Sequence, residues 1–287
     1  MKSSDYKLLD SGNGQKLEQV GPYRLVRQAL QAVWQRKLPA TEWRKADAEF
    51  ERSSDGKGTW TKKNPLMPSQ WVVGKEPRLK VQLTDFGHLG IFPEHAQTWN
   101  TLASCIAKNR LSKKPFKCLN LFAYTGVLTL LVAEAGAEVV HVDASKKSVQ
   151  WASENAQVSG CAHLPIRWIV EDVRKFVAKE LRRGARYQGI ILDPPTFGRG
   201  AKNEVWKIEE DLSPLLKDLR KLCADDVSFV LLTCHTPGFT PLVLKNLISD
   251  IWDTKHVQFG ELTLEESSGR LFPSGSYCLN LSTGSDS

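Results

Sequence analysis

From residue 94 onward, apolar runs of strand length alternate with segments whose apolar residues recur at helical spacing. The runs that predict strands are KCLNLF, AEVVHVD, PIRWIVED, GIILD and VSFVLLT. Helical spacing lies before and between them, in residues 94–111, 127–136, 146–160, 173–183 and 203–223. Strands that alternate with crossover helices predict a mostly parallel sheet with helices on both faces.

Two more strand-like runs, KHVQFGELTL and SYCLNLS, close the chain with no convincing helix between them. An antiparallel hairpin at the edge of the sheet fits this pair. The predicted fold class is therefore α/β, with a doubly wound, mostly parallel, Rossmann-like sheet of seven strands. Ligands of such sheets bind beyond the carboxyl ends of the strands, so a functional site is expected there.

Residues 1–84 have a different texture, with short alternating runs separated by glycine-rich turns. The runs YRLVR, QAVWQ, QWVVG and RLKVQLT predict antiparallel strands, and SGNG and SSDGKG predict turns. We expect a small β-rich domain here and a larger domain over residues 85–287. The small domain is rich in tryptophans, which we expect in its core, with exposed base-stacking platforms as the alternative: Trp34, Trp43, Trp60 and Trp71.

Positive charge is concentrated near the N-terminus. Residues 1–90 hold 16 Lys and Arg against 10 Asp and Glu. The whole chain has 39 and 32, so the remaining residues hold 23 against 22. A basic module beside a near-neutral domain is typical of a protein that binds a polyanion such as RNA. A solvated basic surface without a partner is the alternative.

The composition is that of an ordinary globular chain, 41% hydrophobic and 25% charged. No apolar run approaches the roughly 18 residues that a membrane helix needs, and the first residues lack the apolar core of a signal peptide. The six cysteines form no CxxC pair, and the six histidines do not cluster with them. We therefore expect reduced thiols, no metal site, no membrane partner and a cytoplasmic location. The sequence carries no prediction of the oligomeric state.

The first three predicted strands end in a glycine turn and two acids. Asn120 to Gly126 is a tight turn from strand to helix, with one glycine in place of the three of GxGxxG. Asp143 ends the second strand, 17 residues after Gly126, where an acid is suited to hold ribose hydroxyls. Asp172 and Val173 follow the third strand, where an acid and an apolar side chain suit the amine and the face of an adenine. Capping of the next helix is the alternative for both acids.

The fourth predicted strand ends in ILDPPTFGRG, residues 191–200. Two consecutive prolines remove two backbone donors and fix φ, so the strand stops there. The carbonyls before the prolines and the Asp193 carboxylate then face outward as fixed acceptors. Phe197 follows shortly after and is placed to stack on a flat substrate. This stretch predicts part of an active site more specifically than any other in the chain.

Together, the glycine turn, the two acids and the DPP run on four consecutive strand ends resemble the class I S-adenosylmethionine-dependent methyltransferases. The stretches NLFAYTGVLTL, VVHVDASKKSVQWASENAQ and ILDPPTFGRGAKNEVW more closely resemble the bacterial 23S rRNA methyltransferase group that modifies cytosine C5 or guanine N7. The resemblance covers roughly residues 85–287 and is weaker before them. The preceding TDFGHLGIFPEHAQTWN looks like the segment of that group that enters the cofactor domain and closes over the cofactor.

The resemblance implies a role for each matching residue. The glycine turn would curl around the methionine part of the cofactor, and Asp143 would hold its ribose. Asp193 and Pro194 would lie beside the transferable methyl group and the target base. Asn155 matches an asparagine that packs behind the site. The residues implied in cofactor binding are Phe122, Ala123, Tyr124, Thr125, Gly126, Asp143, Ala144, Ser145, Asp172, Val173 and Asp193.

One position departs from the cytosine-C5 members, which carry a nucleophilic cysteine just after the fifth strand. Here Cys234 lies in that loop beside His235, which would assist a thiolate. Ungapped alignment, however, places Thr236 at the position of the nucleophile. A cysteine that ends a buried strand is more often an inert small hydrophobic residue. Cys234 is therefore a candidate catalytic nucleophile, and methylation of an amino or ring nitrogen stays open.

The predicted function is methylation of an RNA base with S-adenosylmethionine, and large-subunit rRNA is the favoured substrate. For a nitrogen target, the Asp193 carboxylate and the Pro194 carbonyl would accept hydrogen bonds from it, and Phe197 would stack on the base. Arg199, Lys202 and the basic N-terminal domain would bind phosphates. Two alternatives remain: a methyltransferase for a protein side chain or small molecule, and a non-catalytic RNA-binding assembly factor.

Overall fold

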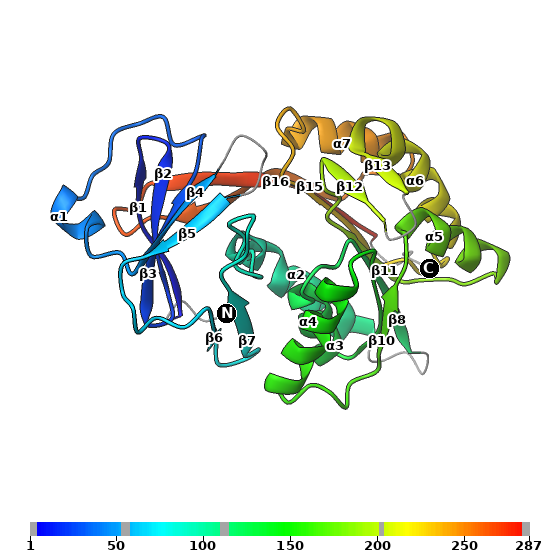
Figure 1. Ribbon diagram of the computed structural model, residues 1–287. Helices are drawn as coiled ribbons and strands as arrows, with labels where there is room; N and C mark the ends of the chain where they lie inside the picture. The colour runs from blue at the N-terminus through cyan, green and yellow to red at the C-terminus, as the bar shows by residue number, and fades with distance from the viewer. Residues whose placement is uncertain (1–4, 53–57, 110–114, 201–203, 283–287) are drawn as a thin grey trace. The chain divides into compact units, whose positions relative to one another are not determined.

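The structure is a computed structural model that describes residues 5–52, 58–109, 115–200 and 204–282. Lys202 and most of the predicted SSDGKG turn lie outside the described residues. The chain divides into two compact units. Figure 1 labels the helices and strands of both. Unit 1 comprises Met1–Ala96 and Thr263–Ser274, and unit 2 comprises Gln97–Leu262 and Gly275–Ser287. The predicted boundary after residue 84 is earlier than this division, and the late segment of unit 1 was not predicted.

Unit 2 is built on a seven-stranded sheet of order β10-β9-β8-β11-β14-β16-β15. The first five strands of this order, from β10 to β14, pair in parallel, and β16 runs antiparallel to β14. This confirms the predicted fold class, with the last two strands at one edge. The strands are β8 (Phe116–Leu121), β9 (Ala137–Asp143), β10 (Ile166–Val170), β11 (Gly189–Leu192), β14 (Phe229–Cys234), β15 (Val257–Glu265) and β16 (Leu271–Leu281).

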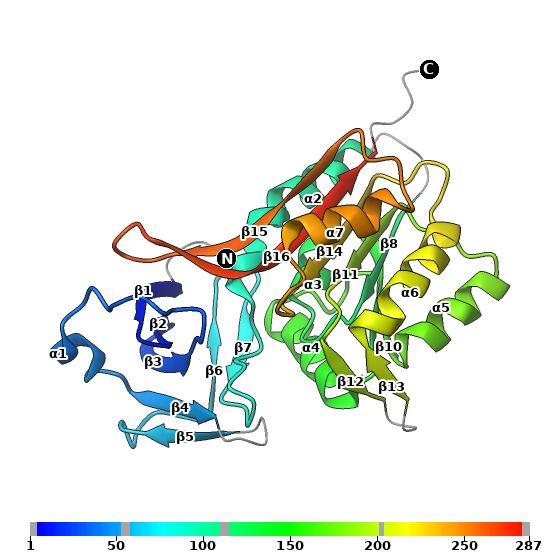
Figure 2. The same ribbon diagram turned by 90° about the horizontal axis from the view of Figure 1, so that it is seen from above.

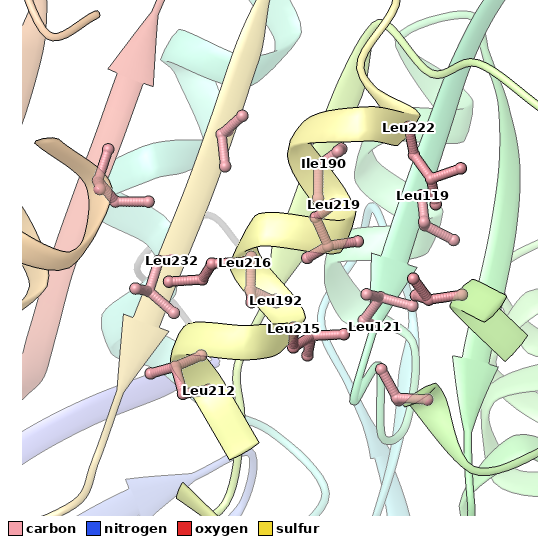
Figure 3. Close-up of a cluster of buried hydrophobic side chains, with 14 of the residues drawn as sticks. Leu119, Leu121, Ile190, Leu192, Leu212, Leu215, Leu216, Leu219, Leu222 and Leu232 are labelled. Atoms are coloured by element: carbon pink, nitrogen blue, oxygen red, sulfur yellow. The ribbon is translucent and has the colours of Figure 1, made fainter. Parts of the chain in front are cut away.

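Helices cover both faces of this sheet, as Figure 2 shows from above. The central strands are apolar on both sides, so that Ile190 and Leu192 of β11 enter one core and Ile191 enters the other. Leucines of α6 pack on the first of these cores against β8, β11 and β14 (Figure 3). The helices are α2 (Ala96–Asn109), α3 (Val127–Glu134), α4 (Lys146–Val158), α5 (Val173–Arg182), α6 (Ile208–Leu222) and α7 (Pro241–Ser249).

Two local features of unit 2 differ from the sequence analysis. The helix expected from residue 203 begins only at Ile208, because the chain first forms a short antiparallel pair, β12 (Phe197–Arg199) and β13 (Val205–Lys207). Helix α7 was not predicted, although Thr240 caps it by accepting a hydrogen bond from the Val243 amide and Pro241 occupies its first turn. None of the helices in the described ranges is long and apolar enough to cross a membrane.

Unit 1 contains a five-stranded sheet of order β1-β2-β3-β4-β5 and a separate two-stranded sheet of β6 and β7. Its elements are β1 (Tyr6–Gly12), β2 (Gln15–Val20), β3 (Tyr23–Gln28), α1 (Ala40–Trp43), β4 (Ala48–Arg52), β5 (Gly58–Lys62), β6 (Gln70–Val73), β7 (Leu79–Gln82) and the 3₁₀ helix η1 (Pro93–His95). The SGNG turn joins β1 and β2, with Asn13 and Gly14 at φ of 55° and 75° as a tight hairpin requires.

The predicted strand QAVWQ is wrong, because residues 31–35 form no ladder. Instead the carbonyls of Ala32 and Trp34 accept hydrogen bonds from the amides of Gly14 and Asn13 in the hairpin turn. Of the four tryptophans of unit 1, Trp43 is buried and the other three are partly exposed, and each is anchored by its indole. Their indole N–H groups donate to Ser11, Asp10, the Thr84 carbonyl and the Val20 carbonyl, in the order Trp34, Trp43, Trp60 and Trp71.

A buried ionic cluster ties β1, β2 and β3 together. The Glu18 side chain is 0% exposed and accepts hydrogen bonds from Arg27 at 2.6 and 2.7 Å and from the Tyr6 hydroxyl at 2.7 Å. Lys16 adds an ion pair at 3.2 Å. Burial raises the pKa of Glu18, but Arg27 and Lys16 outweigh it, and the pKa falls to about 2. The carboxylate is therefore ionised throughout the neutral range.

The late segment of unit 1, Thr263–Ser274, is hydrogen-bonded to β1. The Ser267 amide donates to the Leu8 carbonyl at 3.0 Å, and the Ser11 hydroxyl donates to the Glu266 carboxylate. Arg270 in turn donates to Glu266 at 3.0 Å. Residues from the two ends of the chain thus complete one buried polar network inside unit 1.

Candidate active site

The turn between β8 and α3, Phe122–Gly126, has a strained backbone. Phe122 and Tyr124 adopt φ of 54° and 47°, in the left-handed region that non-glycine residues rarely enter. Gly126 has φ of 82°, and a Cβ there would lie 2.9 Å from the Cβ of Ala152 on α4. Strain of this kind persists only where the surroundings hold it, and it is typical of ligand-binding turns.

Asp143 is one of the groups that hold this turn. One carboxylate oxygen of Asp143 accepts a hydrogen bond from the Tyr124 amide at 2.9 Å, and the other accepts one from the Ser145 amide at 2.8 Å. Burial raises the pKa of Asp143, and these two amide hydrogen bonds act in the opposite direction. The two amides fix the carboxylate in place. Each oxygen keeps a lone pair for a further donor, so the carboxylate can still accept hydrogen bonds from hydroxyl groups.

The strand register brings the other predicted residues to the same edge. Leu192 lies opposite Leu121, so Asp193 and Phe122 leave neighbouring strands side by side. The Glu171 amide donates to the Asp143 carbonyl at 3.1 Å, which places Asp172 next to Asp143 along the edge. The four strand ends that the sequence singled out therefore meet at the carboxyl edge of one parallel sheet.

Two predicted binding residues also have structural roles. Asp172 caps α5, because its carboxylate accepts a hydrogen bond from the Lys175 amide at 3.1 Å, and it forms an ion pair with Arg174 at 3.3 Å. Ser145 caps α4 through the Ser148 amide at 3.2 Å. Val173 is packed in the core of unit 2, which leaves little of its surface for a ligand. The capping alternative for Asp172 is thus present, and its contact with adenine stays a prediction.

Asn155 fits the packing role expected of it. Its side chain is fully buried on α4, and its amide donates to the Thr125 carbonyl at 2.9 Å. The glycine turn is thus held from α4 as well as from β9.

The stretch after β11 forms the other half of the edge. The Asp193 side chain is 19% exposed, and its carboxylate lies 3.6 Å from His235 Nε2 at the end of β14. The hydroxyls of Thr196 and Thr236 are hydrogen-bonded at 2.8 Å, which joins the two loops. Trp206 of β13 donates its indole N–H to the Pro195 carbonyl at 2.7 Å. Sequence reasoning missed this last contact, because nothing local marks Trp206.

Phe197 begins the β12–β13 hairpin and is 50% exposed. The Arg199 guanidinium lies 5.8 Å from the centre of its ring, so a cation accompanies an exposed aromatic face. This is the environment expected of a side chain that stacks on a nucleic-acid base.

Cys234 is packed in the hydrophobic core of unit 2. It is 1% exposed at the end of β14, and its sulfur accepts a hydrogen bond from the Thr236 amide at 3.4 Å. Burial raises the pKa of the thiol, which favours the protonated form. His235, expected to assist Cys234, lies beside Asp193 instead. This environment is that of a small hydrophobic residue.

We expect Cys234→Ala to leave methyl transfer within about twofold of the wild-type rate, since a buried cysteine packs as a small apolar side chain. The measurement is turnover on rRNA, the acceptor that the sequence predicts. Cys278→Ala is the matched control, because Cys278 is a buried cysteine directly opposite Leu232 of β14. Complete loss of turnover in the Cys234 variant alone, with the fold intact, would restore the nucleophile assignment.

A solved structure from Agrobacterium tumefaciens, described as a SAM-dependent methyltransferase, is similar to nearly the whole chain. It is 36% identical with a TM-score of 0.90, and the match covers 97% of this chain and 90% of that one. The chain belongs to the S-adenosylmethionine-dependent methyltransferases. The resemblance inferred from the four strand ends is thus confirmed. No model of a known protein family matches the chain.

Other relatives of this methyltransferase are similar over part of their length. Ribosomal RNA large subunit methyltransferase K/L of Aeromonas hydrophila is 28% identical over 71% of this chain, and methyltransferase K of Neisseria meningitidis serogroup B is 27% identical over 62%. The chain spans 28% and 48% of the lengths of these two relatives. A solved structure from Streptococcus mutans, 17% identical with a TM-score of 0.73 over 97% of this chain and 75% of that one, supports the fold alone.

The residues present fit the cofactor of this family. A carboxylate fixed by two backbone amides suits a pair of ribose hydroxyls, and a strained turn before the N-terminus of α3 suits close approach of a ligand to the backbone. A cavity of about 450 Å³ opens at the opposite edge of the sheet, beside Lys117 and Tyr187. It is remote from all of these residues, so the methyltransferase site is not placed there.

Proposed function

We propose that this methyltransferase transfers a methyl group from S-adenosylmethionine to a base of RNA, with large-subunit rRNA as the substrate. The observation that carries the proposal is the shared edge, where the Asp143-anchored turn adjoins the loop of Asp193 and the exposed Phe197. One side of this edge is suited to a nucleoside cofactor and the other to a flat acceptor. The names of the partial relatives support an rRNA acceptor.

In this proposal the cofactor supplies an activated methyl group on its sulfonium, and the protein supplies alignment and exclusion of water. Asp143 accepts hydrogen bonds from the ribose, and the turn Phe122–Gly126 encloses the methionine part. Asp193 accepts a hydrogen bond from the target nitrogen, which keeps the nitrogen lone pair directed at the methyl carbon. Phe197 stacks on the base after it leaves its helix.

A nitrogen target is favoured over cytosine C5 in the proposal. Carbon-5 transfer needs a thiolate that adds to C6, and Cys234 is buried with a raised pKa. Transfer to nitrogen needs only acceptors beside the base, and the Asp193 carboxylate at the carboxyl edge of the sheet, 3.6 Å from His235, is suited to that task.

RNA binding and location complete the proposal. Residues 1–90 carry a net charge of +6, from 16 basic and 10 acidic residues, and Arg199 accompanies Phe197. We expect the affinity for RNA to fall with rising salt, as it does when cations replace counterions on phosphates. All six cysteines are free thiols, which accords with a reducing compartment such as the cytoplasm.

The decisive experiment compares nucleosides of rRNA from a strain that lacks this protein with those of its parent, by mass spectrometry. We expect one methylated nucleoside to disappear and to return when the wild-type gene is restored. An unchanged nucleoside profile would reject rRNA as the substrate and favour a protein or small-molecule acceptor.

Calorimetric titration of the purified protein with S-adenosylmethionine tests the cofactor separately. Binding with one site per chain is the expected result. Absence of binding, together with salt-dependent RNA binding, would favour the non-catalytic assembly factor.

A further inference from the structure

A chain of buried polar side chains lies beneath the glycine turn. It consists of Asn120 on β8, Thr129 on α3 and His141 on β9, none of them more than 3% exposed. Between a parallel sheet and its covering helix, apolar side chains are the norm and each polar group costs free energy unless it is hydrogen-bonded. The function proposed above assigns no role to any of the three.

The hydrogen bonds in this chain run in one direction. Asn120 Nδ2 donates to Thr129 Oγ1 at 2.8 Å, and Thr129 Oγ1 is hydrogen-bonded to His141 Nδ1 at 2.9 Å. We assign the threonine hydroxyl as the donor to Nδ1, because its oxygen already accepts from Asn120. Burial lowers the pKa of His141 to about 3, so the imidazole is neutral at physiological pH. With Nδ1 as the acceptor, the single ring proton is on Nε2.

The imidazole in turn adjoins the strained turn. Nε2 has no hydrogen bond of good geometry within the described residues, but the Tyr124 backbone acts on the ring and opposes the lowering of its pKa. The Cβ position of Gly126 lies 3.6 Å from His141 Cε1. The amide of the same Tyr124 donates to Asp143. The backbone of Tyr124 thus lies between the Asp143 carboxylate and the His141 imidazole.

We propose that His141, oriented by Thr129 and Asn120, is a positioning residue that holds the turn Phe122–Gly126 in its strained conformation for the cofactor. This inference rests on the proposed function. His141 is buried beneath the turn and contacts no substrate. A turn with two non-glycine residues at positive φ relaxes unless its surroundings over-determine it. The neutral imidazole supplies a rigid support from below, and the relay fixes both its ring orientation and the position of its proton.

The variant His141→Leu removes the support while it keeps an apolar side chain of similar bulk. We expect the dissociation constant for S-adenosylhomocysteine to rise about tenfold, or about 1.4 kcal/mol of binding free energy, because the turn is no longer held in its binding conformation. In turnover assays the KM for S-adenosylmethionine should rise while kcat changes little, because the target-base side of the edge is untouched. His141→Gln keeps a donor and an acceptor and should restore most of the affinity.

Tyr187→Phe is the matched control. The Tyr187 hydroxyl donates to buried Glu180 at 2.8 Å, and Tyr187 precedes β11, so its loss removes a buried hydrogen bond at the opposite edge of the same sheet. We expect this variant to unfold at a lower temperature and to bind S-adenosylhomocysteine with wild-type affinity. The control therefore separates positioning of the turn from general loss of stability.

Wild-type affinity in folded His141→Leu would overturn this inference and leave the proposed function intact. If His141→Leu does not fold, Thr129→Val applies the same test, because it deletes only the hydroxyl that orients the imidazole. An unchanged affinity in that variant would overturn the inference equally. If the wild-type protein binds no S-adenosylhomocysteine, the proposed function is rejected and the inference is rejected with it.

Discussion

The variant Asp193→Ala should lower kcat for methyl transfer by about 100- to 1,000-fold, the usual cost of removing one preorganised polar contact to a transition state. The carboxylate is half-buried and lies 3.6 Å from His235. It follows β11, whose neighbour β8 leads into the turn Phe122–Gly126. The measurement is single-turnover methyl transfer to RNA at saturating cofactor, which isolates the chemical step.

Two further variants make this test specific. Asp193→Asn keeps the shape and one acceptor oxygen, so its rate should fall between those of the alanine variant and the wild type. Asp226→Ala removes an acid near the start of β14, at the opposite edge of the sheet, where it accepts a long hydrogen bond from Gln188 at 3.4 Å. That rate should not change. Full activity in Asp193→Ala would remove this residue from the mechanism.

The variant Arg27→Met should destabilise unit 1 by about 3 to 5 kcal/mol, because it leaves the fully buried Glu18 without its main counter-charge. Hydrogen–deuterium exchange of the β2 and β3 amides reports the stability of this unit without requiring both units to unfold together. Arg24→Met on the same strand is the control. Arg24 pairs with Glu42 at 3.1 Å, and both side chains are about one-third exposed, so the loss should be at most about 1 kcal/mol.

The same cluster predicts how acid acts on the wild-type protein. The pKa of Glu18 is about 2 in the folded state and 4.5 in its ordinary range, so its ionisation stabilises the fold above pH 4.5. That contribution is lost as the pH falls from 4.5 to about 2.

Equal exchange rates in the Arg27 and Arg24 variants would contradict the importance of the buried pair of Arg27 and Glu18.

The parallel sheet was predictable because its strands β8, β9, β11 and β14 are mostly buried and are therefore predominantly apolar runs of strand length. The expected run AEVVHVD coincides with β9, and GIILD differs from β11 by one residue. The carboxyl ends of parallel strands share an edge by construction, so Asp143 and Asp193 were found without knowledge of any contact. The hairpin of β12 and β13 was missed because its strands are three residues long and mostly exposed.

Features that depend on contacts between residues far apart in the sequence could not be predicted from it. QAVWQ alternates as a strand does, but its carbonyls bond to a hairpin turn rather than to a neighbouring strand. The relay from Asn120 to His141 joins three elements whose polar residues look like isolated exceptions in apolar runs. The placement of His235 beside Asp193 depends on the pairing of β11 with β14, which local pattern does not encode.

The return of Thr263–Ser274 to unit 1 has a consequence for how this protein can be altered by recombination. No single cut in the gene yields either unit whole, because a fragment that ends at residue 96 lacks Glu266, the acceptor for buried Ser11. Exchange of the basic module between related genes therefore requires two crossovers that also carry this short segment. We expect Met1–Ala96 and Thr263–Ser274 to be inherited together, although the gene segment for unit 2 separates them.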